Sequence, residues 1–326
     1  MAGGIAEETP SREQLIHTLY EAAELERNLM CTYLYAAFSL KSEEEGLSAV
    51  ESEAVGRWRK LIIRVAIEEM GRLVAVWNIT ASLGGQPRFG RGNFPLDPGY
   101  LPAGIVVKLA PFNANVLQHF VHLERPGGSD EPDGEGFVSE RLFRRDTGQT
   151  GRLRPVPVDY ETAGVFYEHL GPLLRVFSPQ YGESNAFCGD PGLQLSSAEL
   201  DLGGAKPVLY LKTALQAFDA IVAQGKGALA ASEDSHFQKF APIREEYRQL
   251  KAANPDFTPA QPVAPTRCCA GPRRRQARCG WRMRTRWRRW TSPTPVISSC
   301  CGLCAMPTAS PDQIPIMASH SISALR

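Results

Sequence analysis

Two carboxylates stand at apolar positions of two separate predicted helices, and they are the side chains best suited to chemistry. At 100° per residue, Glu26 falls near the centre of the apolar face of its helix. Glu69 is enclosed by apolar side chains on its own wheel, whereas Glu68 points away. A buried carboxylate needs a hydrogen-bonding partner or a cation. Helical bundles bring such carboxylates together around metal ions, so the pair indicates a metal site or a buried ion network.

A histidine on another predicted helix, over residues 232–251, could join them. His236 leads the core-facing stripe of that helix. In metal-binding bundles, carboxylates bridge and neutralise the ions and imidazole fills remaining positions. Further candidate ligands are Glu24, at the edge of the first apolar face, and Glu168 with His169 on another helix.

Caps delimit the helices that must position these side chains. Ser11 and Gln14 form a capping box that begins the first helix, and Gly84-Gly85 end the second. Apolar periodicity predicts helices over residues 11–40, 52–83, 113–123, 160–177, 207–224 and 232–251.

Two long segments carry Gly and Pro in place of helical periodicity. Residues 86–104 predict an ordered loop, the following IVVKL (105–109) has strand character, and residues 126–159 have the composition of an exposed insertion. The chain is therefore expected to be all-α. It should form a helical bundle over residues 11–257, with long loop insertions and one short strand.

The end of the chain differs from the rest in charge. From Ala264 onward it carries eleven Arg, no Lys and one acid, a balance of +10, so the first 263 residues carry −9 of the overall +1. Six of the eight Cys also lie there. Residues 258–326 are expected to form a separate, disordered tail rich in Pro, Arg and Cys.

Three interpretations of this tail can be compared. Cys301-Gly-Leu-Cys304 could belong to a zinc site, but a second Cys-x-x-Cys at finger spacing is missing. The Arg- and Trp-rich run 273–290 could contact nucleic acid, although basic runs usually stay solvated. We favour a shifted reading frame of a GC-rich gene, which resequencing and the intact mass of the C-terminus would test. No nucleic-acid partner is expected.

The sequence also predicts a cytoplasmic protein without a membrane partner. It has no run of about 18 apolar residues, and its N-terminus MAGGIAEETPSREQ lacks the pattern of a secretory signal. Cys31 and Cys188, isolated in the acidic part, fit a reducing compartment.

Six stretches, in order through roughly the first 260 residues, carry a family resemblance. They are ELERNLMCTYLYAAFSLK (24–41), VAIEEMGRLVAVWNITASLGG (65–85), PLDPGYLPAGIVVKLAPF (95–112), GVFYEHL (164–170), IVAQGKG (221–227) and DSHFQKF (234–240). They resemble the ferritin-like domain of the iminophenyl-pyruvate dimer synthase family. That family includes enzymes of violacein and rebeccamycin-type pigment biosynthesis, which couple two imines derived from amino-acid oxidation. The resemblance implies a ferritin-like bundle, a di-iron cofactor and secondary metabolism.

The sequence departs from the family pattern where ligands are expected. The pattern places His after the first-helix Glu and in the Glu-Met-x-His of the second helix, where this chain has Arg27 and Arg72. It places Glu in the Gly-x-Phe-Tyr stretch and acids in the Gln-Gly-x-Gly turn, where this chain has Val165 and Ala223 with Lys226. Guanidinium has no lone pair, and Lys is a ligand only after losing its charge. These replacements predict weak metal binding or none, which about two iron or manganese ions per purified chain would contradict.

Two functions follow. In the first, Glu26, Glu69 and His236 hold metal in an enzyme of the imine dimer synthase type, or a di-metal oxidoreductase, acting on a small molecule. In the second, Arg72 and Lys226 pair with the acids in a buried ion network, and the bundle is a non-catalytic scaffold or the partner of a biosynthetic enzyme. A homo-oligomer is compatible with both, and metal content distinguishes them.

Overall fold

The computed structural model describes residues 10–42, 45–88, 94, 105–137, 160–223 and 235–265. The chain divides into two units, Met1–Pro272 and Arg273–Arg326, and all described residues belong to the first. The predicted tail beyond residue 265 lies outside the described residues, as do most of the predicted loop 86–104 and insertion 126–159.

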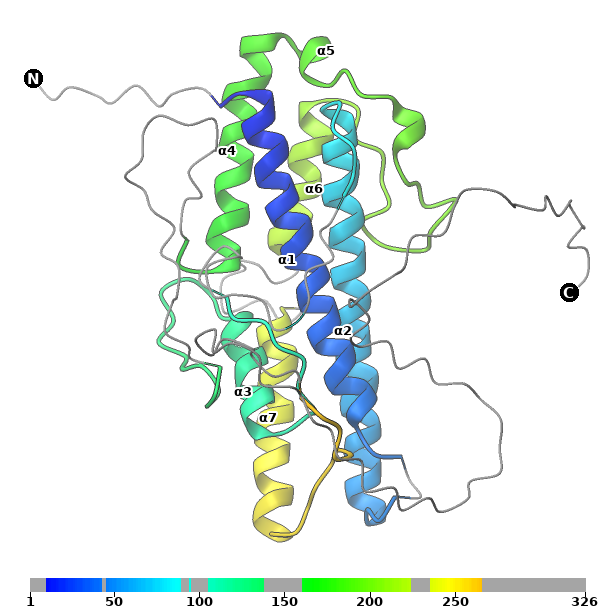
Figure 1. Cartoon of the computed structure of the whole chain (residues 1–326), viewed down its shortest axis with the longest axis vertical. Coiled ribbons are helices and arrows are strands. Elements are labelled where there is room, and N and C mark those ends of the chain that lie inside the picture. Colours follow the sequence, from blue (N-terminus) through cyan, green and yellow to red (C-terminus); the bar gives the residue numbers. More distant parts are fainter. Residues whose placement is uncertain are drawn as a thin grey trace, which may run out of the picture. The chain divides into compact units, whose positions relative to one another are not determined.

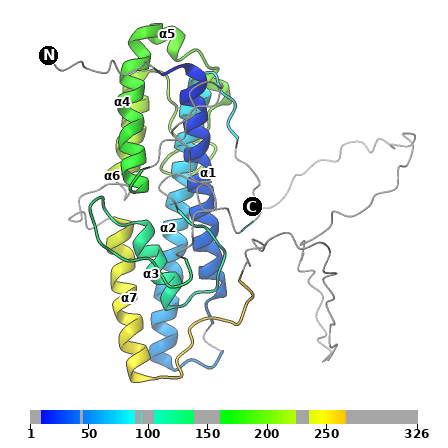
Figure 2. The ribbon, with the colours of Figure 1, turned by 60° about the vertical axis from the view of Figure 1, so that its left-hand side comes forward.

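The described residues form an all-α bundle, as predicted. Its helices are α1 (Arg12–Ser39), α2 (Ala49–Ser82), α3 (Ala114–Leu123), α4 (Ala163–Tyr181), α5 (Glu183–Ala186), α6 (Leu211–Ala223) and α7 (His236–Ala253), with a short 3₁₀ turn at Pro191–Leu193. The long helices α1 and α2 lie side by side, while α4 packs with α6 along one half of the bundle and α3 with α7 along the other (Figures 1 and 2). The two shorter pairs therefore follow each other along the α1/α2 pair, and their ends meet near its middle.

Capping boxes begin both long helices. The Ser11 hydroxyl accepts from the Gln14 N–H, and the Gln14 side chain accepts from the Ser11 N–H at 2.6 Å. Ser48 and Glu51 form the same reciprocal pair. This second box starts α2 at Ala49, three residues before the predicted position, because it satisfies N–H groups that the first turn leaves unpaired.

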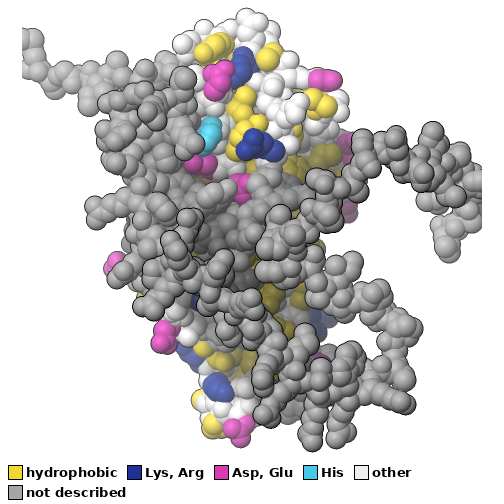
Figure 3. Space-filling model, viewed as in Figure 1, with side chains coloured by type: hydrophobic (Ala, Val, Ile, Leu, Met, Phe, Trp, Pro, Cys, Tyr) yellow, Lys and Arg dark blue, Asp and Glu magenta, His cyan; other side chains and the backbone are white. Residues whose placement is uncertain are grey.

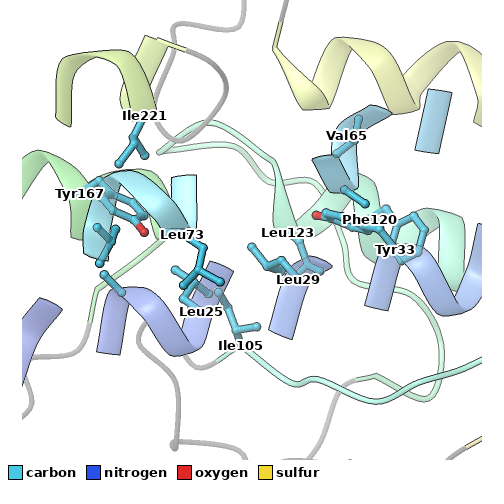
Figure 4. Packing of buried hydrophobic residues seen from close by; sticks show 14 of the residues in the cluster. Leu25, Leu29, Tyr33, Val65, Leu73, Ile105, Phe120, Leu123, Tyr167 and Ile221 are labelled. Carbon is cyan, nitrogen blue, oxygen red and sulfur yellow. The ribbon is translucent and has the colours of Figure 1, made fainter. Parts of the chain in front are cut away.

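The predicted strand at residues 105–109 is wrong. These residues have no regular structure, and the described part of the chain contains one isolated bridge, between Leu40 and Ala260. Ile105 and Val107 are instead buried against the bundle, and Ile105 belongs to the same buried cluster as Leu25 of α1 (Figure 4). The β-branched run is apolar because it covers the core as a loop, without a neighbouring described strand to complete a ladder.

Gly204, in the loop before α6, lies in direct contact with Gly71 of α2. A Cβ on Gly204 would lie 1.6 Å from the Gly71 carbonyl oxygen, whereas a Cβ on Gly203 would meet nothing within 4 Å. The backbone of this loop therefore rests on α2 next to Arg72.

We expect Gly204→Ala to lower the free energy of unfolding by about 1–3 kcal/mol, because its methyl group must push the loop away from α2. Gly203→Ala is the matched control and should stay within about 0.5 kcal/mol of the wild type. Urea unfolding followed by circular dichroism measures both. Equal unfolding midpoints for the two variants would contradict the close contact.

His119 anchors the segment after α3. Its ring is buried, its Nδ1 lies 2.6 Å from Asp133 Oδ1, and it stacks on Phe137 with the ring centroids 3.8 Å apart. Burial lowers the pKa of His119 more than Asp133 raises it. The folded protein therefore favours the neutral imidazole, which donates to the Asp133 carboxylate.

This arrangement predicts a loss of stability in mild acid. Because the pKa of His119 is lower in the folded state than in the unfolded chain, the unfolded chain binds more protons as the pH falls below about 6.5. The contribution of His119 to the free energy of unfolding should fall between pH 7 and pH 5. The stability of the wild type relative to His119→Asn, which keeps a donor for Asp133 but does not titrate, should therefore decrease over this range. His17→Asn, at an exposed position, is the control. Identical pH profiles for wild type and His119→Asn would contradict the prediction.

None of the helices in the described ranges is long and apolar enough to cross a bilayer. On the face shown in Figure 3, acidic and basic side chains of the described surface are interspersed, and neither sign gathers into a patch there.

Candidate metal centre

Charged side chains from separate helices meet in the middle of the bundle, where the two shorter helix pairs meet. The buried groups are Glu26 of α1, Glu69 and Arg72 of α2, Glu124 at the end of α3, and His236 at the start of α7. Each is at most 2% exposed. Charges at this depth persist only when they neutralise and hydrogen-bond one another.

Arg72 and Glu69 form the central ion pair. They are three residues apart on α2 and therefore share one face of the helix. Arg72 Nη1 donates to Glu69 Oε1 at 2.9 Å. Burial lowers the pKa of the guanidinium, but the attraction of Glu69, Glu26 and Glu124 outweighs it and raises that pKa further above its usual range. Arg72 is thus a permanent cation inside the bundle.

His236 lies between four charged groups. Its Nδ1 is 3.1 Å from Glu69 Oε1 and 3.5 Å from Glu124 Oε1. Its Nε2 is 2.7 Å from Glu68 Oε2 and 3.3 Å from Arg72 Nη2. Burial and Arg72 lower the pKa of the imidazole, but Glu124 and Glu68 raise it more, to about 9.

Glu68 holds the outer nitrogen of His236. It is one-quarter exposed, and Lys239 donates to both of its oxygens, at 2.9 and 2.8 Å. The helical wheel placed Glu68 away from the core, and the structure places it at the rim of the centre. A carboxylate that fixes Nε2–H turns Nδ1 inward, toward Glu69 and Glu124, which is how proteins usually orient a histidine ligand.

Glu124 is the group that sequence reasoning missed. It is the C-cap residue of α3, and Tyr33 Oη donates to its Oε1 at 2.5 Å. Burial raises the pKa of Tyr33 well above its usual value, with Glu124 and Glu69 adding to the effect, so the phenol remains a donor. A carboxylate at the negative end of a helix favours a nearby cation. The signal was its spacing, since Glu124 follows Phe120 by four residues and Leu117 by seven on the buried face of α3.

Glu26 also attracts Arg72 and is held by a second tyrosine. Tyr167 Oη donates to Glu26 Oε1 at 2.6 Å. Burial raises the pKa of Tyr167 well above its usual value, and Glu26 raises it further. Figure 4 shows Tyr33 and Tyr167 approaching the middle of the bundle from its two halves. The two phenols orient one carboxylate each.

Three of these groups form a donor set for one metal ion. One ligand atom each from Glu69, Glu124 and His236 lies within 4.8 Å of the others, and this is the one such group among the described residues. The three buried carboxylates carry three negative charges, of which Arg72 cancels one. His236 must release its proton to become a ligand, and a single divalent ion would then cancel the other two charges. The donor set thus fits one divalent ion, whereas a second would leave excess positive charge beside a guanidinium that has no lone pair.

The other predicted site residues lie outside this donor set. Glu24 is nearly buried on α1, and burial raises its pKa more than Arg27 and Arg88 lower it. Glu168 and His169 are exposed on α4, so they do not supply donors to the buried centre.

The structure also describes most of the positions at which this chain lacks the residues of the family pattern. Arg27 is partly buried, with its Nη1 3.4 Å from Asn28 Oδ1. Val165 is partly buried near the start of α4. Arg72 alone of these enters the centre, and Lys226 lies outside the described residues.

Comparison with known proteins shows the family to which this bundle belongs. A family model described as Ferritin-like matches residues 19–245, more than half of the chain. The chain belongs to the ferritin-like family. This confirms the fold that the sequence resemblance implied.

Two relatives of this ferritin-like chain show how far the likeness extends. It is 26% identical over 292 residues to a Chromobacterium violaceum protein named 2-imino-3-(indol-3-yl)propanoate dimerase. That alignment covers 78% of the chain but 25% of the relative, so the chain spans about a quarter of the length of this curated relative. A solved ferritin-like protein from Caulobacter vibrioides is 19% identical, with a TM-score of 0.45 and coverage of 72% of this chain and 73% of that one.

Proposed function

We propose that this ferritin-like protein binds one divalent metal ion at Glu69, Glu124 and His236. We further propose that it uses this centre in oxidative or imine-coupling chemistry on small, amino-acid-derived substrates. The observation that carries the proposal is the convergence of two carboxylates and one imidazole from α2, α3 and α7. Carboxylate and imidazole donors suit iron and manganese, which would supply Lewis acidity or redox chemistry.

The surrounding residues have roles that follow from their contacts. Glu68 and Lys239 fix the imidazole of His236 from outside. Tyr33 holds the Glu124 carboxylate, and Arg72 holds Glu69. These hydrogen bonds orient the donors before any ion is present, which lowers the entropy lost on metal binding.

The substrate class rests on the relative whose name describes dimerisation of an imine derived from an amino acid. Because the chain matches about a quarter of that protein, the remaining steps of such a reaction would need other domains or a partner enzyme. The same proposal includes iron as the metal, a cytoplasmic location and a role in secondary metabolism.

Metal content tests the proposal. Protein purified without chelator, loaded with Fe²⁺ under anaerobic conditions or with Mn²⁺, and passed through a desalting column should retain about one ion per chain by elemental analysis, as the charge balance requires. Two ions per chain would contradict the role of Arg72. No retained ion, together with no calorimetric heat of binding, would contradict the metal centre itself.

The second candidate function is a metal-free scaffold. The 2.9 Å pair between Arg72 and Glu69 and the raised pKa of His236 favour it, because two cations inside the centre already balance most of the carboxylate charge. In that case the bundle would serve as a binding partner within a biosynthetic complex. Absence of metal binding by a fully folded chain is the result that selects this function.

A further inference from the structure

A cavity of about 380 Å³ lies between α2, α6 and the loop that precedes α6. Small residues on the two helices leave this space open, among them Gly71 and Ala75 of α2 and Ala217 and Ala220 of α6. The close contact of Gly204 with the α2 backbone forms one wall. A body the size of an aromatic ring with a short side chain fits such a volume.

The charged residues that line this cavity are both basic. Arg72 and Lys206 are there, and the described lining residues include no acid. Lys206 is exposed, and its carbonyl accepts from Asn78 Nδ2 at 3.0 Å, so its backbone is fastened to α2. Arg72 is already paired with Glu69 inside the bundle, so Lys206 is the cation that faces this concave site. An exposed cation in an otherwise small, apolar or neutral lining attracts an anion with an apolar body.

Arg72 also links the cavity to the buried centre. Its two Nη atoms contact Glu69 and His236, and Arg72 is also one of the residues that line the cavity. A molecule in the cavity is therefore next to the charged cluster without contacting the three donors, none of which lines the cavity.

We propose that this cavity binds a small organic acid whose carboxylate is held by Lys206 and whose apolar body lies against α6. This extends the proposed function by placing the organic ligand, but it does not depend on a bound metal. Anion binding and metal binding can therefore fail separately.

The test is calorimetric titration of the full chain with 3-phenylpropanoate, with the neutral analogue 3-phenyl-1-propanol and with inorganic phosphate. We expect saturable binding of the acid, binding of the alcohol at least about tenfold weaker, and weak binding of phosphate, because both the charge and the apolar body contribute. Lys206→Gln should raise the Kd of the acid about three- to tenfold. Ala220→Phe, at an exposed helix position, should abolish binding by filling the cavity.

Lys212→Gln is the matched control, since Lys212 is an exposed α6 residue outside the lining. The proposal is overturned if the alcohol or phosphate binds as tightly as the acid, or if Lys206→Gln and Ala220→Phe bind like the wild type. Repeating the titration in EDTA separates the two proposals. Unchanged binding supports the cavity, whereas loss of binding on chelation would assign the anion to a metal and overturn it.

Discussion

Replacing Arg72 by methionine is expected to lower the free energy of unfolding of the metal-free protein by about 3–5 kcal/mol. The change keeps most of the side-chain volume but removes the guanidinium that pairs with the fully buried Glu69. Removing one partner of a buried ion pair leaves the other charge in a medium that solvates it poorly. Chemical denaturation in the presence of EDTA gives this value directly.

The control for this variant is Arg57→Met on the same helix. Arg57 is about half exposed and pairs with Glu53 and Glu246 at the surface, so its loss should cost about 1 kcal/mol or less. If both variants lost the same stability, Arg72 would not be an essential counterion. Adding Mn²⁺ at about 100 times its Kd should return about 2.7 kcal/mol to Arg72→Met, because the ion binds only the folded chain.

The second large effect is expected from Glu124→Gln, which should raise the Kd for Mn²⁺ by about 100-fold or more. An amide oxygen is a poorer ligand than a carboxylate, and the change also removes one of the charges that attract the ion. The amide can still accept the hydrogen bond from Tyr33, so the variant should fold. Calorimetric titration with Mn²⁺ measures the affinity, and circular dichroism verifies the fold.

Glu24→Gln provides the comparison for Glu124→Gln. Glu24 was a candidate ligand from its position on the helical wheel, but it lies outside the donor set. Its replacement should leave the Kd for Mn²⁺ within about twofold of the wild type. A wild-type affinity in Glu124→Gln, or an equal loss in both variants, would show that the ion binds elsewhere.

The helical wheels anticipated the burial of Glu26 and Glu69, because a regular helix converts sequence spacing into direction. His236 was placed on a core-facing surface by the same reasoning. Glu124 could not be assigned so readily, since it caps a ten-residue helix and its role depends on where that helix packs. Packing of α3 against α7 brings Glu124 to His236, and no local pattern contains that contact.

The predicted strand at residues 105–109 shows that a local pattern can also indicate an element that does not form. Alternating burial of Ile105 and Val107 is the pattern of a strand, but a ladder also requires a neighbouring backbone at the right distance. Likewise, Glu68 is placed correctly at the edge of its wheel, yet the wheel does not reveal that α7 approaches that edge and supplies His236 and Lys239. Local geometry was predictable, and contacts between distant segments were not.

The built-in cation at Arg72 also bears on the order of events during synthesis of the protein. Domains whose buried ligands carry only negative charge often wait for metal before they can fold. Here part of the compensating charge is encoded in α2 and arrives with the chain itself. The bundle can thus close without metal. Under the proposed metal binding, the supply of metal in the cell would govern how much of the protein carries an ion, and not how much of it folds.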